Sequence, residues 1–556
     1  MDSITVKLTI EAGGAEISRA VRKGTTIESL VNEYRSRLVY RVMGAFVDNR
    51  EKELTYVIEK DCSVTFLDLR NNFADRMYQR SLMLLYLKAV YDVLGEADTD
   101  ILNSLNRGLF TRINTPEPVT DEQITAIEAR MWELGDRNLP IKRTLVSREQ
   151  LLEQAGAYLT PKRKELLLSA PDVHYIALYE IDGFSNYFYG RMVPSTGYLR
   201  WFELHRYENG ILLRYPHPMY PDRLPPYIND EKLFKAFDEG WNIADAFGLS
   251  FAADLNKAIV KGETNGIITL SERLHAGGIS KIADTIAQTN RRVVLIAGPS
   301  SSGKTTFAKR LIARLEENGV SSLYLGTDDY FVERKDSPRD EKGEYNYEGV
   351  DAIDVGLFNN NINLLLSGAE TDLPTYDFIA GEKRFGERIS RLDPGQVIVI
   401  EGIHALNADM TRQIAAGEKF RVYISPLSQL NLDDHNRIPT TDVRLLRRII
   451  RDARTRGTGA AGTIKSWPKV RRGEDINIFP YSADADVFFN SSLIYELAII
   501  KPFAEKALRE VDSANPAYSD AERLLDFLAF FEAAESADAV PANSILREFI
   551  GSDADG

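Results

Sequence analysis

The stretch "LIAGPSSSGKTTFAKRL", Leu295 to Leu311, carries the clearest chemistry of the 556-residue chain. It fits the pattern G-x-x-x-x-G-K-[ST], in which the backbone N–H groups of a glycine-rich loop surround phosphate oxygens at the start of a helix. An apolar run precedes the loop and an amphipathic pattern follows it, so a strand, a loop and a helix are predicted in the required order. We therefore expect nucleotide phosphates to bind at Gly298, Pro299, Ser300, Ser301, Ser302, Gly303, Lys304, Thr305 and Thr306.

Two later strands are predicted to end in acidic residues. "SSLYLGTDDYF" places Asp328 and Asp329 after the next strand, and "QVIVIEGIHAL" places Glu401 at the end of a third. The carboxyl ends of parallel strands form the ligand-binding edge of an open sheet, where a kinase needs a carboxylate to accept the proton of the attacking hydroxyl. We expect Lys304 to reach the β- and γ-phosphates, and Thr305 and Glu401 to hold Mg²⁺, partly through water.

A basic segment, "DVRLLRRIIRDARTRG", contrasts with the acidic balance of the chain. Arg444, Arg447, Arg448 and Arg451 follow helical spacing on one face, and Arg454 and Arg456 come next. A charge run is often only a solvated helix face. Downstream of a phosphate-binding loop, however, we interpret it as an arginine lid, because arginines that close over a γ-phosphate neutralise developing charge and exclude water.

Length and composition describe a protein of several domains. Apolar residues make up 44% and charged residues 27%, as in ordinary globular proteins. The 82 acidic against 68 basic residues, net charge -14, oppose indiscriminate binding of nucleic acid. No apolar run reaches the roughly 20 residues that span a bilayer, and no signal peptide is evident. With a single cysteine as well, the sequence predicts a cytoplasmic protein without a membrane partner.

The patterns along the chain predict a multidomain α/β and α+β protein. Five segments are expected: a small β-rich domain, a mixed α+β domain, a helical connector, a doubly wound parallel-sheet domain around the phosphate-binding loop, and a short helical C-terminal tail. Their predicted boundaries are 1–69, 70–225, 226–290, 291–510 and 511–556.

The fourth segment resembles the uridine kinase and phosphoribulokinase family. The matching strings, from about residue 291 to 506, are "GPSSSGKTT", "TDDYF", "YNYEGVDAID", "LPTYDF", "VIVIEGI" and "RRIIRDARTRG". The resemblance implies ATP and Mg²⁺ as cofactors and Asp328 as the catalytic base, with Lys304, Arg451 and Arg456 as further catalytic residues. It implies that the acceptor is bound by Phe331, Glu348, Tyr376, Arg384 and Arg448.

Three positions depart from that family. Gly381 stands where uridine-cytidine kinases have a histidine that reads the pyrimidine edge, and Thr458 replaces a lid arginine. Glu348 replaces a sugar-contacting aspartate and is one methylene longer. We therefore expect phosphoryl transfer to a hydroxyl, with either a relaxed base preference or a non-pyrimidine substrate.

The first 225 residues resemble the front of threonyl-tRNA synthetase. Residues 1–69 are similar to its TGS domain, a ubiquitin-like β-grasp, and residues 70–225 to its editing domain, through "YQRSLMLLYLKAV" and "YGRMVPSTGYLRWFEL". The four metal-ligand positions of that editing domain fall on Arg80, Leu84, Phe188 and Met192. None of these is a competent ligand, so a retained scaffold without catalytic metal or deacylase activity is expected. This arrangement resembles the large uridine-kinase-like proteins of bacteria.

These observations predict an ATP-dependent kinase that phosphorylates the 5′-hydroxyl of a nucleoside, as in nucleotide salvage. Two alternatives stay open: a kinase of another sugar or sugar phosphate, and a nucleotide-switched regulator that holds RNA or tRNA with its front half. Binding of RNA or tRNA is the less favoured alternative, and a homo-oligomer is also an open one.

Overall fold

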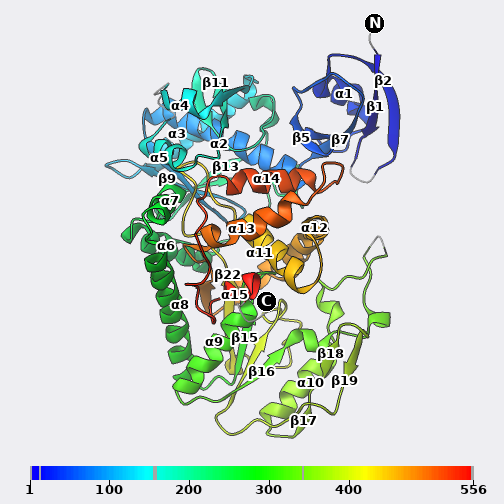
Figure 1. The fold of residues 1–556 in the computed structure, drawn as a ribbon, viewed down its shortest axis with the longest axis vertical. Helices are drawn as coiled ribbons and strands as arrows, with labels where there is room; N and C mark the ends of the chain where they lie inside the picture. The colour runs from blue at the N-terminus through cyan, green and yellow to red at the C-terminus, as the bar shows by residue number, and fades with distance from the viewer. Residues whose placement is uncertain (1–2, 12–13, 154–158, 341–342, 552–556) are drawn as a thin grey trace.

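The computed structural model describes residues 3–11, 14–153, 159–340 and 343–551. In Figure 1 two smaller units, drawn in blue and cyan, lie at the top, and the green, yellow and orange region around a parallel sheet lies below them. None of the helices in the described ranges is long and apolar enough to cross a membrane.

The first unit is a sheet of five strands with one helix, in the strand order β2-β1-β7-β4-β5. β1 pairs in parallel with β7 and antiparallel with β2, and its alternating pattern buries Val6 and Leu8 on one face. The elements are β1 (Ser3–Thr9), β2 (Glu16–Arg22), β3 (Thr25–Thr26), α1 (Ile27–Glu33), β4 (Val42–Val47), β5 (Arg50–Glu53), β6 (Val57–Ile58) and β7 (Cys62–Asp68).

The second unit packs two antiparallel sheets around the helix α2 (Asn72–Leu94), which Asn71 caps by accepting from the N–H of Phe73. The sheet orders are β13-β14-β9-β8 and β10-β11-β12. The remaining elements are β8 (Asp98–Leu105), β9 (Gly108–Asn114), α3 (Asp121–Asp136), β10 (Lys142–Ser147), α4 (Arg148–Glu153), α5 (Pro161–Ser169), β11 (Tyr175–Ile181), β12 (Phe184–Tyr187), β13 (Glu203–Tyr207) and β14 (Gly210–Arg214).

Three helices connect this unit to the parallel sheet: α6 (Glu231–Ala246), α7 (Ala252–Val260) and α8 (Thr264–Ala287). The long helix α8 packs beside the helix that follows the phosphate-binding loop, as Figure 1 shows in green.

The third region is built on a sheet in which every neighbouring pair of strands is parallel, in the order β16-β21-β15-β22-β23. The predicted parallel sheet is confirmed. Its elements are β15 (Val293–Ala297), α9 (Lys304–Glu317), β16 (Ser322–Gly326), α10 (Val355–Leu366), β17 (Thr371–Asp372), β18 (Thr375–Asp377), β19 (Glu382–Arg384), β20 (Ile389–Ser390), β21 (Val397–Glu401), β22 (Lys419–Ser425), α11 (Thr440–Thr455), α12 (Ala460–Asn477), β23 (Val487–Asn490) and α13 (Glu496–Arg509).

The C-terminal residues are not a separate tail. α14 (Tyr518–Leu528) contacts β5 of the first unit, where the backbone N–H of Glu51 donates to Ser519 Oγ at 3.0 Å. α15 (Arg547–Ile550) lies against α11. Ile545, Leu546 and Phe549 are fully buried in the same apolar core as β15, α9 and β22. The residues that end the described chain therefore belong to the core around the phosphate-binding loop.

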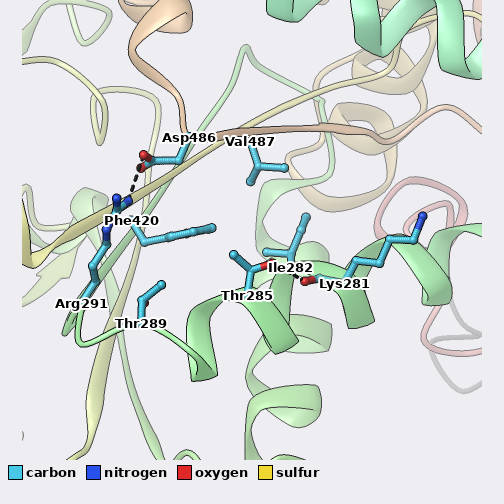
Figure 2. A pocket seen from close by; sticks show the side chains of 8 residues that line it. All are labelled: Lys281, Ile282, Thr285, Thr289, Arg291, Phe420, Asp486 and Val487. Carbon is cyan, nitrogen blue, oxygen red and sulfur yellow. Dashed lines mark hydrogen bonds and ion pairs between the residues drawn. The ribbon is translucent and has the colours of Figure 1, made fainter.

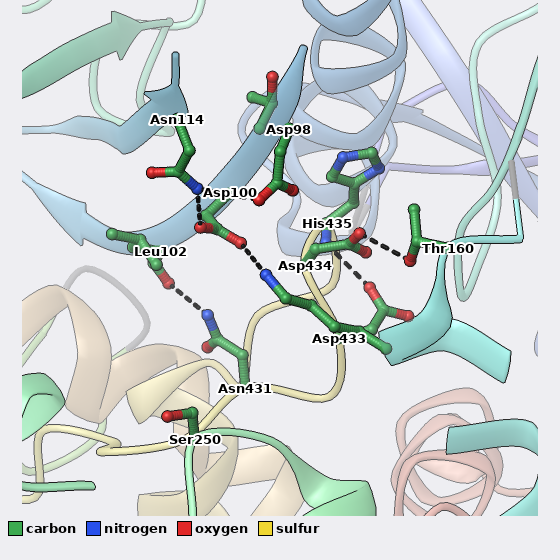
Figure 3. Close-up of polar contacts among 12 residues, drawn as sticks. Asp98, Asp100, Leu102, Asn114, Thr160, Ser250, Asn431, Asp433, Asp434 and His435 are labelled. Atoms are coloured by element: carbon green, nitrogen blue, oxygen red, sulfur yellow. Dashed lines mark hydrogen bonds and ion pairs between the residues drawn. The ribbon is translucent and has the colours of Figure 1, made fainter. Parts of the chain in front are cut away.

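The second unit also holds the loop between β22 and α11 through a buried ionic cluster. Arg163 Nε lies 2.6 Å from Asp434 Oδ1 and 3.8 Å from Asp433 Oδ1, and all three side chains are at most 1% exposed. Thr160 Oγ1 also donates to Asp434 at 2.9 Å (Figure 3). Burial opposes ionisation of Asp434, but the guanidinium beside it holds the pKa of that carboxyl well below its usual range.

Candidate active site

The phosphate-binding loop, residues 298–303, connects the central strand β15 to α9. All five residues of β15 are buried, because the strand pairs on both sides and both sheet faces are covered. A Cβ atom at position 298 would lie 2.0 Å from the backbone oxygen of Ile424, so only glycine fits there. Gly303 has φ +85°, in the left-handed region, and α9 begins at the next residue, Lys304. The predicted strand, loop and helix are thus present.

The loop holds polar groups that the protein itself leaves unpaired. The hydroxyls of Ser301 and Ser302 are buried and, within the described ranges, make no hydrogen bond. Buried polar groups normally have partners, because an unpaired one costs free energy. Lys304 folds back over the loop, and its Nζ donates to the Pro299 oxygen at 3.2 Å. Together with the partial positive charge of the α9 N-terminus, these groups fit a loop that binds phosphate.

The two aspartates that follow β16 have different surroundings. Asp329 Oδ2 lies 3.1 Å from Arg388 Nη1, and its other oxygen accepts weakly from the N–H of Tyr376 at 3.5 Å. Asp328 is solvent-exposed at the carboxyl edge of the sheet. The carboxylate of Asp329 is therefore already paired within the protein, whereas that of Asp328 is accessible to a bound molecule.

The charges around Asp328 come from the elements that the sequence motifs predicted to meet. Although its surface is accessible, surrounding protein partly desolvates the carboxyl and raises its pKa above the ordinary value. Lys304 and Arg456 lower this pKa and Asp329 raises it, which places these charges near the carboxyl. A carboxylate with a raised pKa is a better proton acceptor.

Thr305 and Glu401 meet directly. Glu401 ends β21, and its Oε2 accepts from Thr305 Oγ1 and from the Tyr324 hydroxyl, both at 3.2 Å. Burial raises the pKa of Glu401, and Lys304 opposes this effect. A hydroxyl beside a carboxylate is the kind of oxygen pair that Mg²⁺ takes together with water and phosphate oxygens, so these residues fit that ion.

Three of the predicted arginines gather around one carboxylate at the C-terminal end of α11. Arg448, Arg451 and Arg456 place side-chain nitrogens 3.3, 3.1 and 3.5 Å from the oxygens of Asp452. Arg448 Nη1 also donates to Ser300 Oγ at 2.9 Å. The second half of α11 is therefore in contact with the phosphate-binding loop.

The prediction that Arg444 and Arg447 belong to a lid face is wrong. Arg444 forms an ion pair with Glu474, and Arg447 Nη2 lies 2.7 Å from Glu496 Oε2; both arginines are at most 1% exposed. The first turns of α11 lie between α12 and α13, which supply these acids. Arg444 Nε donates to the Ser300 backbone oxygen at 2.9 Å, so this pair supports the loop from within the protein.

Aromatic side chains line the region beyond Asp329. The ring of Phe331 lies edge-on to those of Tyr347, Tyr376 and Phe378, with centroid distances of 5.6, 5.8 and 6.2 Å. Phe331 and Tyr376 are buried, whereas Phe378 is 60% exposed. The structure thus brings two predicted acceptor residues into one aromatic cluster.

Glu348 and Arg384, two of the three remaining predicted acceptor residues, differ in their surroundings. Burial raises the pKa of Glu348 and Arg448 lowers it, which places Glu348 near the arginine that contacts the phosphate-binding loop. Arg384, on the hairpin of β18 and β19, forms an ion pair with Asp377 and is largely exposed. Glu348 is thus drawn into the charged site, and Arg384 is engaged at the hairpin.

An arginine covers the position of the absent histidine. Gly381 has φ +77°, and a Cβ atom there would lie 2.7 Å from Arg334 Cβ and 2.9 Å from Arg334 Cζ. Arg334 is held by hydrogen bonds to the backbone oxygens of Phe378 and Ile379. The place of the histidine side chain is therefore taken up by Arg334, a long cation with different hydrogen-bonding groups.

Two acids at the loop could not be found from the motifs. Glu474 Oε1 accepts from the N–H of Ser300 at 3.0 Å, and Glu548 Oε2 accepts from Thr306 Oγ1 at 3.0 Å. They lie 174 and 242 residues along the chain from their partners, and no spacing signal connects them. Only the fold brings them to the loop.

A separate cavity of about 370 Å³ lies at the opposite edge of the sheet (Figure 2). Residues of α8 and the starts of β22 and β23 line it, and Arg291 pairs with Asp486 at 2.9 Å beside it. It is at the amino ends of the strands, away from the loop and the acidic residues, so it is not part of the candidate active site.

The four editing-domain positions of the second unit lie in packed surroundings. Leu84, Phe188 and Met192 are at most 1% exposed within the apolar core of that unit. Arg80 Nη1 donates to the Arg191 backbone oxygen at 3.2 Å. Among the described residues, no three His, Cys, Asp or Glu side chains form a group that could hold a metal. The lack of a catalytic metal in this unit stays a prediction.

A parallel sheet with a phosphate-binding loop after its central strand, and acids at the same edge, defines a P-loop nucleotide-binding protein. The sequence pattern of the Phosphoribulokinase / Uridine kinase family matches residues 293–494. A uridine kinase of Staphylococcus aureus (strain JH9) is 32% identical over 196 residues, which are 35% of this chain and 85% of that protein. A uridine kinase of Deinococcus deserti is 31% identical over 175 residues, 32% of this chain and 75% of that protein.

The chain therefore belongs to the phosphoribulokinase and uridine kinase family, through its third region. This makes it a P-loop kinase with ATP as phosphate donor and a small molecule as acceptor. A solved structure described as a possible uridine kinase from Bacillus stearothermophilus aligns over 38% of this chain and 97% of its own, with 24% identity and a TM-score of 0.26.

Proposed function

We propose that the protein transfers the γ-phosphoryl group of ATP to the 5′-hydroxyl of a nucleoside, giving a nucleoside monophosphate and ADP. The observation that carries this proposal is the difference between the two aspartates at the sheet edge. Asp328 is accessible and lies near Lys304 and Arg456, whereas Asp329 is bound to Arg388. A kinase needs a free carboxylate at this place, between the phosphates and the acceptor.

In this mechanism the protein mainly positions the phosphates and the attacking hydroxyl, and neutralises the charge of the transferring group. The backbone of the phosphate-binding loop and Lys304 hold the β- and γ-phosphates. Asp328 accepts the proton of the attacking hydroxyl, so its oxygen becomes a better nucleophile as it approaches phosphorus in line. Arg451 and Arg456, released from Asp452, would turn toward the transferring group and stabilise the charge that spreads over its oxygens.

Thr305 and Glu401 would hold Mg²⁺, directly or through water. When bound there, the ion would screen the charge of the β- and γ-phosphate oxygens. Since Thr305 lies in the first turn of α9 and Glu401 ends β21, the distance between the two ligands is fixed by the sheet rather than by a loop.

On the acceptor side, the aromatic cluster of Phe331, Tyr347, Tyr376 and Phe378 would contact the base, and Glu348 the sugar. Flat aromatic faces bind bases of any identity, because every base has a π-face. Arg334 in place of a histidine supports a base preference unlike that of uridine-cytidine kinases.

The front half is proposed to be a TGS-like domain followed by an editing-like domain that serves as a scaffold. The order of strands in the first unit, with β1 and β7 parallel at its centre, supports the first assignment. The apolar packing of Leu84, Phe188 and Met192 supports the second.

The test is a panel of nucleosides, sugars and sugar phosphates incubated with ATP and the full-length protein. The proposal expects one nucleoside to give ADP and a nucleoside monophosphate in equal amounts. Product formed only with a sugar or sugar phosphate would overturn the choice of acceptor. Slow ATP hydrolysis that needs no acceptor and is stimulated by RNA would overturn the proposal as a whole.

A further inference from the structure

We propose that the C-terminal segment, residues 541–551, forms a wall of the ATP site and that Glu548 binds the ribose of the donor nucleotide. This inference rests on ATP being the phosphate donor, and it does not depend on which acceptor is used. The segment begins 47 residues beyond the last residue matched by the family pattern, position 494. It is therefore a part of the donor site that the family pattern does not contain.

The segment lies against the phosphate-binding loop. Ile545 lies directly on the loop, because its Cγ2 would be 2.4 Å from a Cβ atom at Gly303. Arg454, in the last turn of α11, donates to the backbone oxygens of Glu548 and Phe549 at 3.1 and 3.3 Å. In Figure 1 the red segment accordingly lies where α9 and α11 approach each other. It spans the space between the phosphate-binding helix and the arginine helix.

Buried apolar side chains fix the segment in place. Ile545, Leu546 and Phe549 are fully buried, and Phe549 also lies under the guanidinium of Arg447 at 5.0 Å. Fully burying one apolar side chain stabilises the fold by about 1.5–3 kcal/mol, so moving all three from the core into water would cost several times that amount. The backbone of the segment is therefore a permanent wall, and ATP must bind with the segment in place.

Glu548 is the carboxylate that this wall directs to the loop. Glu548 Oε2 accepts from Thr306 Oγ1 at 3.0 Å, in the first turn of α9. The backbone N–H groups of such a loop cradle the α- and β-phosphates and the lysine reaches the β- and γ-phosphates, so the ribose, which follows the α-phosphate, comes next to the start of α9. A carboxylate repels phosphate but accepts hydrogen bonds from ribose hydroxyls, as acidic residues do in dinucleotide sites. Glu548 is therefore suited to the ribose.

Space for the rest of the nucleotide lies beside the segment. A cavity of about 610 Å³ begins at Thr306 and Glu548 and runs between α8, α9 and the segment. This volume is within the range of small-molecule sites. Ile279 and Ala313 contribute apolar surface to its wall, and Asn543 adds hydrogen-bonding groups. Charged side chains complete the lining: Lys309, Arg310, Arg314, Glu317 and Arg547. The cavity can take the ribose and the base, which would make the C-terminal segment a determinant of donor choice.

The test measures nucleotide binding by calorimetry in the absence of acceptor, with ATP, 2′-deoxy-ATP, 3′-deoxy-ATP and inorganic tripolyphosphate. The full-length protein is compared with Glu548→Ala and with Glu535→Ala, an exposed acid of the same C-terminal region. A hydrogen bond to a charged group typically changes affinity by about tenfold or more. We expect the unaltered protein to prefer ATP over at least one deoxy analogue by about tenfold.

Glu548→Ala should abolish that preference and leave tripolyphosphate binding equal or tighter, whereas Glu535→Ala should change nothing. Ala313→Trp, which fills the cavity, should weaken ATP binding and spare tripolyphosphate. If Glu548→Ala instead tightens ATP and keeps the ribose preference, the segment competes with the nucleotide and the inference is wrong. An unchanged ribose preference at unchanged affinity overturns it too. Because no acceptor is present, a failure of the nucleoside proposal would leave these results untouched.

Discussion

The second unit and the parallel-sheet region differ in what surrounds the positions at which sequence motifs place chemistry. In the second unit, Leu84, Phe188 and Met192, at the predicted editing-domain positions, are closed within an apolar core. At the phosphate-binding loop, the hydroxyls of Ser301 and Ser302 are buried without a partner in the described ranges. Unpaired buried groups cost stability, and a fold retains them where a ligand will pair them. These surroundings indicate that the parallel-sheet region carries the chemistry and that the second unit supports it.

Removing the proposed general base, Asp328, tests most directly whether the parallel-sheet region carries the chemistry. Asp328→Asn should lower turnover by about a hundred- to ten-thousand-fold and leave ATP affinity nearly unchanged, because general-base removal does not touch the loop that binds phosphate. Lys304→Ala should damage both. Single-turnover rates and ATP binding measure the two effects.

Asp329→Asn is the matched control. Asp329 is bound to Arg388, so its substitution should be milder in turnover and should act through local packing. If Asp329→Asn is the inactive variant and Asp328→Asn stays active, the base has been assigned to the wrong aspartate.

The next prediction concerns the supporting role of the second unit. Arg163→Met leaves Asp433 and Asp434 buried without their cation, which should lower the free energy of unfolding by about 3–5 kcal/mol. Arg206→Met, which removes an exposed ion pair to Asp121, should cost about 1 kcal/mol or less. Urea unfolding of the full-length variants measures both. Equal losses would show that the buried cluster does not hold the units together.

The pH dependence of kcat/KM tests Asp328 in another way. The base must be ionised, so the rate should fall about tenfold per unit as the pH drops below its pKa. Because burial raises the pKa of Asp328, the acidic limb should have its midpoint above the ordinary aspartate value of about 3.9. A limb at or below that value would contradict the desolvated environment of Asp328.

A smaller effect is expected on the preference of the protein for one nucleobase over another. With Arg334 covering the position of the histidine, the preference for uridine over inosine and guanosine should stay within about tenfold, since one hydrogen bond contributes about 0.5–1.5 kcal/mol. Arg334→Ala should change the ratio of kcat/KM values, while Lys335→Ala, at the exposed neighbouring position, should not. A uridine preference of a hundredfold or more in the unaltered protein would contradict this prediction.

Removing metal ions is expected to leave the stability of the second unit unchanged. Metal analysis of the purified protein should find no stoichiometric zinc, and a chelator should leave its thermal midpoint in place, because Arg80, Leu84, Phe188 and Met192 offer no ligands. The protein should also release no amino acid from charged tRNA. Stoichiometric zinc that resists dialysis would contradict the scaffold role.

Features of the fold and the site that depend on a local pattern or on the order of the strands could be predicted from the sequence. β15, the loop and α9 follow from one motif, and Thr305 meets Glu401 because parallel strands end at a common edge. The roles of Arg444 and Arg447 could not be predicted, since the acids that pair with them come 30 and 49 residues later on other helices. Helical spacing gives the face of a residue, but only packing decides whether that face meets solvent or a carboxylate.

The contact between the second unit and the loop before α11 has a consequence for dynamics. The N–H of Ile101, in β8, donates to the Asp434 backbone oxygen at 2.8 Å, so an amide of one unit is bonded to the chain of another. Such an amide exchanges its proton with solvent only when the two units separate, or when one of them unfolds. Its exchange rate therefore reports on opening between the units and is insensitive to movements of the arginines at the far end of α11. The protein carries within its own backbone a probe that separates these two motions.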